Sequence, residues 1–87
     1  MLKVQRSGNV QVVFKLSGRM EAENIAELER LIRSEVDGRP IVLDLEDLML
    51  VNREAVSFLE RCEVENITLE NCPAYIREWI TRQRQRS

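Results

Sequence analysis

The chain has 87 residues, of which 44% are hydrophobic and 32% are charged, and its formal net charge is −2. These proportions are typical of a globular protein, and the length predicts a single domain over residues 1–87. No run of about 18 apolar residues could span a membrane, and residues 1–6 lack the apolar core of a signal peptide. The sequence therefore predicts a cytoplasmic protein, and the small net charge does not indicate nucleic-acid binding.

The side chains that most catalytic chemistry needs are missing from this sequence. Histidine is absent, which removes the usual general base and the commonest metal ligand. Cys62 and Cys72 are too few for a zinc site, and we expect both to be reduced, buried hydrophobic residues. Asp44 and Glu54 are the only candidates for acid/base catalysis near the carboxyl end of a predicted strand, and the scattered glycines form no phosphate loop. We expect no catalytic residue, no metal and no cofactor.

The first half of the chain predicts a hairpin followed by a helix. Apolar and polar residues alternate over Leu2–Arg6 and Val10–Leu16, around a turn at residues 7–9 that contains Gly8 and Asn9. Gly18 is expected to close this hairpin. Over Glu21–Val36 apolar residues recur at three- and four-residue steps, which favours a helix that stops before Gly38 and Pro40. These residues are Ile25, Leu28, Leu31, Ile32 and Val36.

The second half predicts two further strand–helix units. Ile41–Leu45 is almost continuously apolar, which is typical of a parallel strand with helices on each side. Leu48–Val51 would then be an apolar connection to a second helix capped by Asn52. The stripe expected to be buried on that helix is Ala55, Phe58, Leu59 and Cys62, with Arg53, Glu60, Arg61 and Glu63 facing outward. A short strand is expected over Asn66–Glu70.

A last helix is expected to open at Pro73, whose missing N–H is harmless in a first turn. Its apolar face would be Tyr75, Ile76, Trp79 and Ile80. Residues 77–87 form a basic helical end, which is either a frayed, solvated terminus or a contact for phosphate or an acidic partner. The complete order β-β-α-β-α-β-α predicts an α/β fold, an open sheet with parallel central strands and helices packed on it.

These elements in this order resemble the STAS domain, which occurs in anti-sigma factor antagonists and in the cytoplasmic tails of sulfate transporters. The similarity runs from about Val10 to Ile80 and rests on the hairpin end Leu16–Met20, the strand Ile41–Leu45, and the apolar turn into a short helix. The chain is shorter than a typical member and lacks the family's final strand, so it resembles a short, divergent one.

The resemblance implies a partner-binding site at the start of the second helix, where antagonists carry a D-S-S-G-L stretch. Here that stretch is Asn52-Arg53-Glu54-Ala55-Val56, and Glu54 stands where the family's serine is phosphorylated by the partner kinase. Ser57 is the nearest hydroxyl, about one helical turn further on. The family's phosphorylation switch is therefore expected to be missing. Glu54 is either a fixed negative charge in place of a phosphate or simply a favourable first-turn glutamate.

Asp44 matches the family's strand aspartate and completes the predicted partner-binding set of Asn52, Arg53, Glu54 and Ser57. It is expected either to contribute to the partner surface or to accept hydrogen bonds from the start of the second helix. The leading functional hypothesis is a regulatory module that binds a protein partner, such as an anti-sigma factor or a kinase-like regulator. One alternative is an accessory domain of a transporter. The other is a self-associating subunit, for example a homodimer, whose contact surface would consist of Leu48, Met49, Leu50, Val51 and Trp79.

Overall fold

The computed structural model describes residues 2–8, 10–35 and 38–86, except for the side chain of Arg86. In these residues the chain forms four strands and three helices in the predicted order. They are β1 (Leu2–Ser7), β2 (Val12–Met20), α1 (Ala22–Arg33), β3 (Ile41–Val51), α2 (Arg53–Val64), β4 (Thr68–Glu70) and α3 (Ala74–Arg86). Asn9 of the expected turn and Val36 of the expected helix lie outside the described residues.

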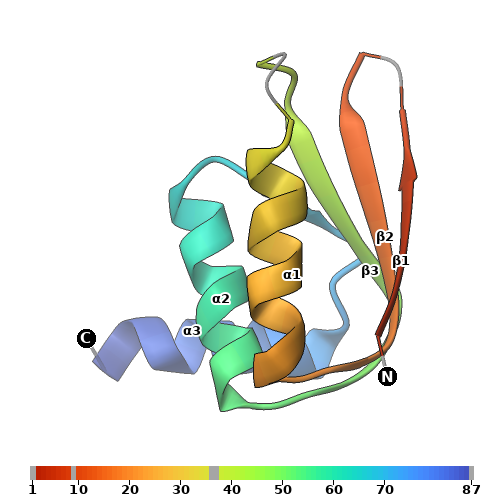
Figure 1. Ribbon diagram of the computed structural model, residues 1–87. Coiled ribbons are helices and arrows are strands. Elements are labelled where there is room, and N and C mark those ends of the chain that lie inside the picture. The colour runs from red at the N-terminus through yellow and green to blue at the C-terminus, as the bar shows by residue number, and fades with distance from the viewer. Residues whose placement is uncertain (1, 9, 36–37, 87) are drawn as a thin grey trace.

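The strands form one sheet in the order β1-β2-β3-β4. β1 and β2 pair antiparallel as the predicted hairpin, with Val4 opposite Leu16. β2 pairs parallel with β3, and β3 pairs parallel with β4, so the centre of the sheet is parallel as expected. The amino end of α2 therefore lies at the sheet edge where β2 and β3 end (Figure 1).

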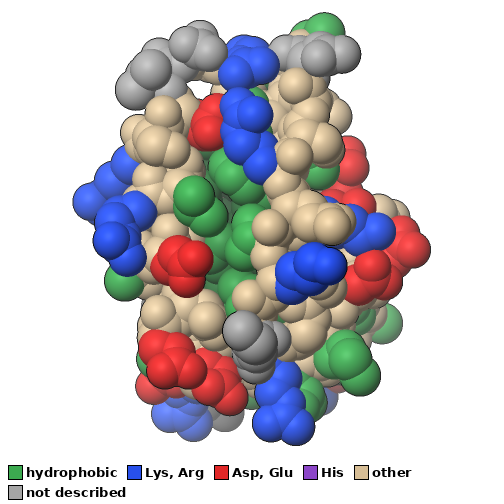
Figure 2. Space-filling model, turned by 45° about the vertical axis from the view of Figure 1, so that its right-hand side comes forward, with side chains coloured by type: hydrophobic (Ala, Val, Ile, Leu, Met, Phe, Trp, Pro, Cys, Tyr) green, Lys and Arg blue, Asp and Glu red, His purple; other side chains and the backbone are tan. Residues whose placement is uncertain are grey.

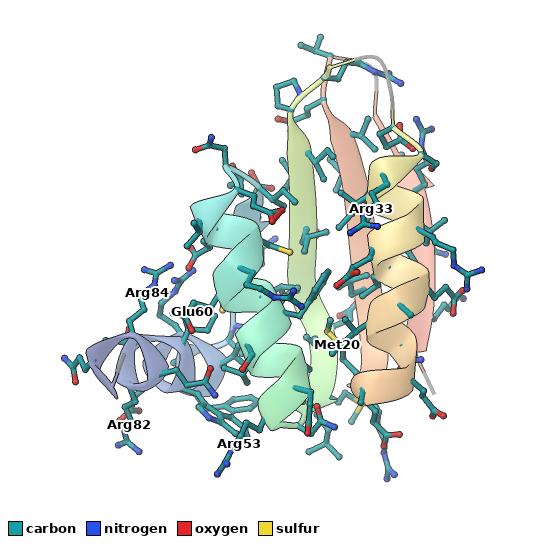
Figure 3. All side chains as sticks on the ribbon, turned by 60° about the vertical axis from the view of Figure 1, so that its left-hand side comes forward. Met20, Arg33, Arg53, Glu60, Arg82 and Arg84 are labelled. Carbon is teal, nitrogen blue, oxygen red and sulfur yellow. The ribbon has the colours of Figure 1, made fainter. Side chains whose placement is uncertain are left out.

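The helices pack on one face of the sheet, which corrects the expectation of helices on each side. Figures 1 and 3 show α1 and α2 side by side over the same face. One buried cluster joins the three helices to this face, and it includes Phe14, Leu16, Leu43, Leu45, Leu28, Val56, Leu59, Ile76 and Ile80. Val42 is also buried but stands apart from that cluster, level with Val13 and Thr68 in the neighbouring strands. The continuous apolar run of β3 therefore does not depend on a second layer of helices.

The core reaches the surface between α1 and β1. Figure 2 shows a strip of hydrophobic side chains there, bordered by charged ones, and Leu2, Val4 and Leu31 are partly buried residues of these two elements. Arg6 of β1 forms an ion pair of 2.8 Å with Glu35, which follows α1. That pair links the first strand to the segment that follows the helix.

β3 is longer than predicted because two bulges change its alternation. The partner of Lys15 is Asp44 but the partner of Ser17 is Asp47, and a second shift follows Gly18. Each bulge adds one residue to β3, so two successive side chains face solvent in each case: Glu46 and Asp47 after buried Leu45, and Met49 and Leu50 after buried Leu48. Leu48–Val51 is thus strand and not a connection. Gly18 adopts a φ of 95° at the second shift, inside β2, and does not close the hairpin.

The remaining elements start or stop within a few residues of the predicted positions. Glu21 is the N-cap of α1, which ends at Arg33, three residues before the predicted end. β4 begins at Thr68 because the N–H of Ile67 still donates to Cys62 at the end of α2. None of the helices in the described part of the chain combines the length and the apolar character that crossing a bilayer requires.

Candidate functional site

The amino end of α2 is capped as the sequence predicts. The side-chain oxygen of Asn52 accepts a hydrogen bond of 2.9 Å from the N–H of Ala55, and its backbone is extended. This cap fixes where the helix starts, so Arg53 and Glu54 become its first two residues. Both side chains are exposed, and neither forms an ion pair or a hydrogen bond with another described residue. Two free, oppositely charged groups therefore stand at one helix terminus.

Two concave surfaces flank this terminus. The α2/α3 hollow has a volume of about 390 Å³, and its lining residues are Arg53, Tyr75, Glu78, Trp79, Arg82 and Gln83. The α1/α2 groove has about 480 Å³, and its lining residues are Ala22, Ile25, Ala26, Glu29, Arg53, Glu54, Ser57 and Arg61. Arg53 lines both, whereas Glu54 lines only the groove. Figure 3 shows Arg53 and Arg82 extending below α2 and α3.

Ser57 lies one turn further along α2, and its hydroxyl is already engaged. It is half-buried, and its Oγ donates a hydrogen bond of 3.1 Å to Gln83 Oε1 of α3. A modifying enzyme would have to break this contact with the Gln83 side chain to reach the oxygen. The structure thus places Ser57 between two helices, in agreement with its expected position inside the helix.

Asp44 is not part of this site, because β3 runs on to Val51 before α2 begins. At about 3.3 Å per residue, the eight residues from Asp44 to Asn52 cover roughly 20–25 Å. Asp44 Oδ1 accepts hydrogen bonds from the N–H of Glu46 (3.0 Å) and from Asn71 Nδ2 (3.2 Å). The Glu46 N–H, helped by Asn71, holds the pKa of Asp44 below its ordinary value. The expectation that Asp44 fixes the start of α2 is therefore wrong, since it orders the β3–β4 end of the sheet.

The basic end of the chain is held by carboxylates and does not extend freely. Glu63 of α2 contacts Arg77 at 2.9 Å and Arg84 at 2.8 Å, and both arginines belong to α3. The hydrogen bond from Arg77 is the main cause of the lowered pKa of Glu63. Arg82 pairs within α3 with Glu78 at 2.6 Å. The described part of residues 77–87 is thus helical, and two ion pairs to Glu63 connect it to α2.

The two cysteines are free thiols. Cys62 is buried in the core, and burial raises its pKa to about 12. Cys72 is only partly buried, which corrects the expectation that both are core residues, and its pKa is raised for the same reason. Among residues 2–8, 10–35 and 38–86, no group of three His, Cys, Asp or Glu side chains is arranged to hold a metal ion.

One wall of the α2/α3 hollow was not predicted from the sequence. Tyr75, Glu78, Trp79 and Arg82 are spaced by three, four and seven residues, so they share a helix face beside the buried Ile76 and Ile80. Tyr75 was expected to lie in the core, but its side chain is 48% exposed, and its hydroxyl donates to the Met49 carbonyl at 2.7 Å. This hydrogen bond gives the Met49 carbonyl a partner in the part of β3 that does not pair with β4. The spacing of Tyr75 and Trp79 is evident in the sequence, but it predicted that both side chains are buried in the core. It did not indicate that they line a separate, exposed face of α3.

Comparison with known proteins supports the fold. No protein-family model matches the chain, and no curated protein matches it either. A solved structure of an uncharacterised DUF3478-family protein with a SpoIIAA-like fold, from Shewanella loihica PV-4, aligns with a TM-score of 0.56 and 17% identity. The alignment covers 98% of this chain and 75% of that one. The chain therefore has the SpoIIAA-like fold, which is the fold of STAS domains and anti-sigma factor antagonists.

Proposed function

We propose that this chain is a non-catalytic, cytoplasmic regulatory domain that binds a protein partner through the amino end of α2. The observation that carries the proposal is the pair Arg53 and Glu54, exposed and without a partner among the described residues, at the terminus that Asn52 fixes. The SpoIIAA-like fold supports it, because the equivalent helix start carries the regulatory stretch in the antagonists that this chain resembles. The partner would be an anti-sigma factor, a kinase-like protein or another regulator.

Glu54 at this helix start would give the domain a permanent negative charge in place of reversible phosphorylation. Glu54 supplies about one negative charge, where a phosphoserine would supply roughly 1.5 to 2. The α2 dipole stabilises this carboxylate by about 0.3–1 kcal/mol. The nearest hydroxyl of α2, on Ser57, is bound to Gln83. The domain would therefore act as a permanently modified antagonist. If Glu54 were only a favourable first-turn residue, its charge would have no effect on partner binding.

The test compares charge variants in capture from the native cytoplasm. Immobilised wild-type protein should retain a defined partner that Arg53→Glu loses. Arg30→Glu, which makes the same charge change on the exposed face of α1, should retain it. Glu54→Gln should alter partner retention if the fixed charge matters. Equal retention by wild type, Arg53→Glu and Arg30→Glu would refute the proposed site, and equal retention by Glu54→Gln would leave Glu54 a structural residue.

A second candidate function is self-association, which one observation favours. Met49 and Leu50, at the end of β3, are 73% and 52% exposed, although both are large apolar residues. Of the other residues expected in that surface, Leu48 is buried, and Val51 and Trp79 are half-buried. Sedimentation equilibrium distinguishes the two functions. A dimer that Leu50→Lys dissociates would support self-association, and a monomer at high protein concentration would count against it.

A further inference from the structure

The α2/α3 hollow carries an uncompensated positive charge. Three charged side chains line it, namely Arg53, Glu78 and Arg82. Glu78 is already bound to Arg82 at 2.6 Å, so these two charges offset each other. Arg53 has no such partner in the described part of the chain and lies in the first turn of α2, where the helix dipole also favours an anion. A ligand that completes this hollow would therefore bring an anionic group to Arg53.

The rest of the lining is aromatic. Trp79 is half-buried between the core and the hollow, and Tyr75 is held in place by its hydrogen bond to the Met49 carbonyl. The apolar surface continues past Tyr75 to Met49, whose side chain is 73% exposed. Tryptophan, tyrosine and arginine are the residues most often found to dominate protein–protein binding energy. Rigid rings next to a free guanidinium suit a large apolar side chain that has a carboxylate beside it.

The openness of the hollow to solvent favours a protein segment over a small molecule. Small-molecule sites enclose most of their ligand, whereas Arg53, Tyr75, Glu78 and Arg82 are all exposed here. A side chain anchored by its own backbone can use such a surface, and its neighbours can extend over Met49. We propose that the α2/α3 hollow receives an acidic segment of the partner, with an aromatic or large aliphatic side chain against Trp79 and a carboxylate on Arg53. This inference rests on the proposed function and names what the partner presents.

Trp79 provides the assay, because it is the only tryptophan in the chain. The probes are the capped peptide Asp-Phe-Glu, its neutral counterpart Asn-Phe-Gln, its small counterpart Asp-Ala-Glu, and free phenylacetate. We expect Asp-Phe-Glu to change Trp79 fluorescence saturably, with a dissociation constant below about 1 mM, and the other three to bind more weakly. Equal binding of the neutral peptide would exclude the carboxylate contact, and equal binding of phenylacetate would make this a small-molecule site.

Matched variants locate the peptide. Arg53→Glu should weaken binding roughly tenfold, since attraction becomes repulsion at close range. Tyr75→Ser should weaken it by about fivefold through loss of the ring contact. Arg30→Glu, far from the hollow, should change it by less than about twofold. No saturable change with wild type, or equal affinity for Arg53→Glu, would overturn the inference. If partner capture still depended on Arg53 in that case, the proposed function would stand and only the hollow would be excluded.

Discussion

The cap at Asn52 decides where α2 begins, and its contribution to stability can be worked out from one hydrogen bond. In Asn52→Ala the N–H of Ala55 loses its acceptor at 2.9 Å. Ala55 is fully buried, so water cannot readily replace that acceptor. We expect a loss of about 1–2 kcal/mol in the free energy of unfolding, which is in the upper half of the range for N-cap substitutions. For a domain of this size, that loss lowers Tm by roughly 5–15 °C.

Urea unfolding followed by Trp79 fluorescence and by far-UV circular dichroism measures this loss. Asn52→Asp and Asn52→Ser serve as controls because each keeps an oxygen that can accept the same bond. Both controls should stay within about 0.5 kcal/mol of wild type. If Asn52→Ala were as stable as Asn52→Asp, the side chain would not cap α2. The position of Arg53 and Glu54 would then need another explanation.

Three further predictions concern the core, the acid response and the thiols. Ile80→Ala should cost about 2–5 kcal/mol in urea unfolding, because Ile80 is fully buried and joins α3 to the core; a loss below about 1 kcal/mol would mean that α3 is not docked. The pKa of Glu63 is lowered in the folded state, so its stabilisation is complete above about pH 4.5 and disappears as the pH falls through that lowered pKa. Glu63→Gln should therefore reduce the loss of unfolding free energy at acidic pH. An unchanged loss would contradict a stabilising role for the ion pairs between Glu63 and α3. A thiol reagent at pH 8 should modify Cys72 well before Cys62, whose pKa is about 12; equal rates would contradict the burial of Cys62.

Local chemistry explains why the order of elements and the start of α2 could be predicted. A hairpin needs only alternation around a turn, and a helix start needs only a side chain such as Asn52 that accepts N–H groups. The structure confirms both, together with the parallel centre of the sheet. The hairpin and the helix start depend on residues close together in the chain, and the parallel centre follows from the alternation of strands and helices.

The errors lie where the structure depends on pairing between distant segments. The bulges between the partners of Lys15 and Ser17, and between those of Gly18 and Arg19, exist only in the register between β2 and β3. The sequence alone therefore did not predict the full length of β3. A short β3 would bring Asp44 close to Asn52. In the structure, the strand from Asp44 to Val51 separates the two residues. The wall of the hollow formed by Tyr75 and Trp79 depends on how α3 crosses α2, which no periodicity encodes.

The location of the docking surface can be tested most directly by mapping backbone amide NMR shifts of the labelled domain upon addition of its captured partner. We predict that the largest changes fall at residues 52–57 and 75–83, on the two sides of the α2/α3 hollow. Changes confined to the helix-free face of the sheet, around Lys15, Val42 and Asp44, would place the partner elsewhere and contradict the account.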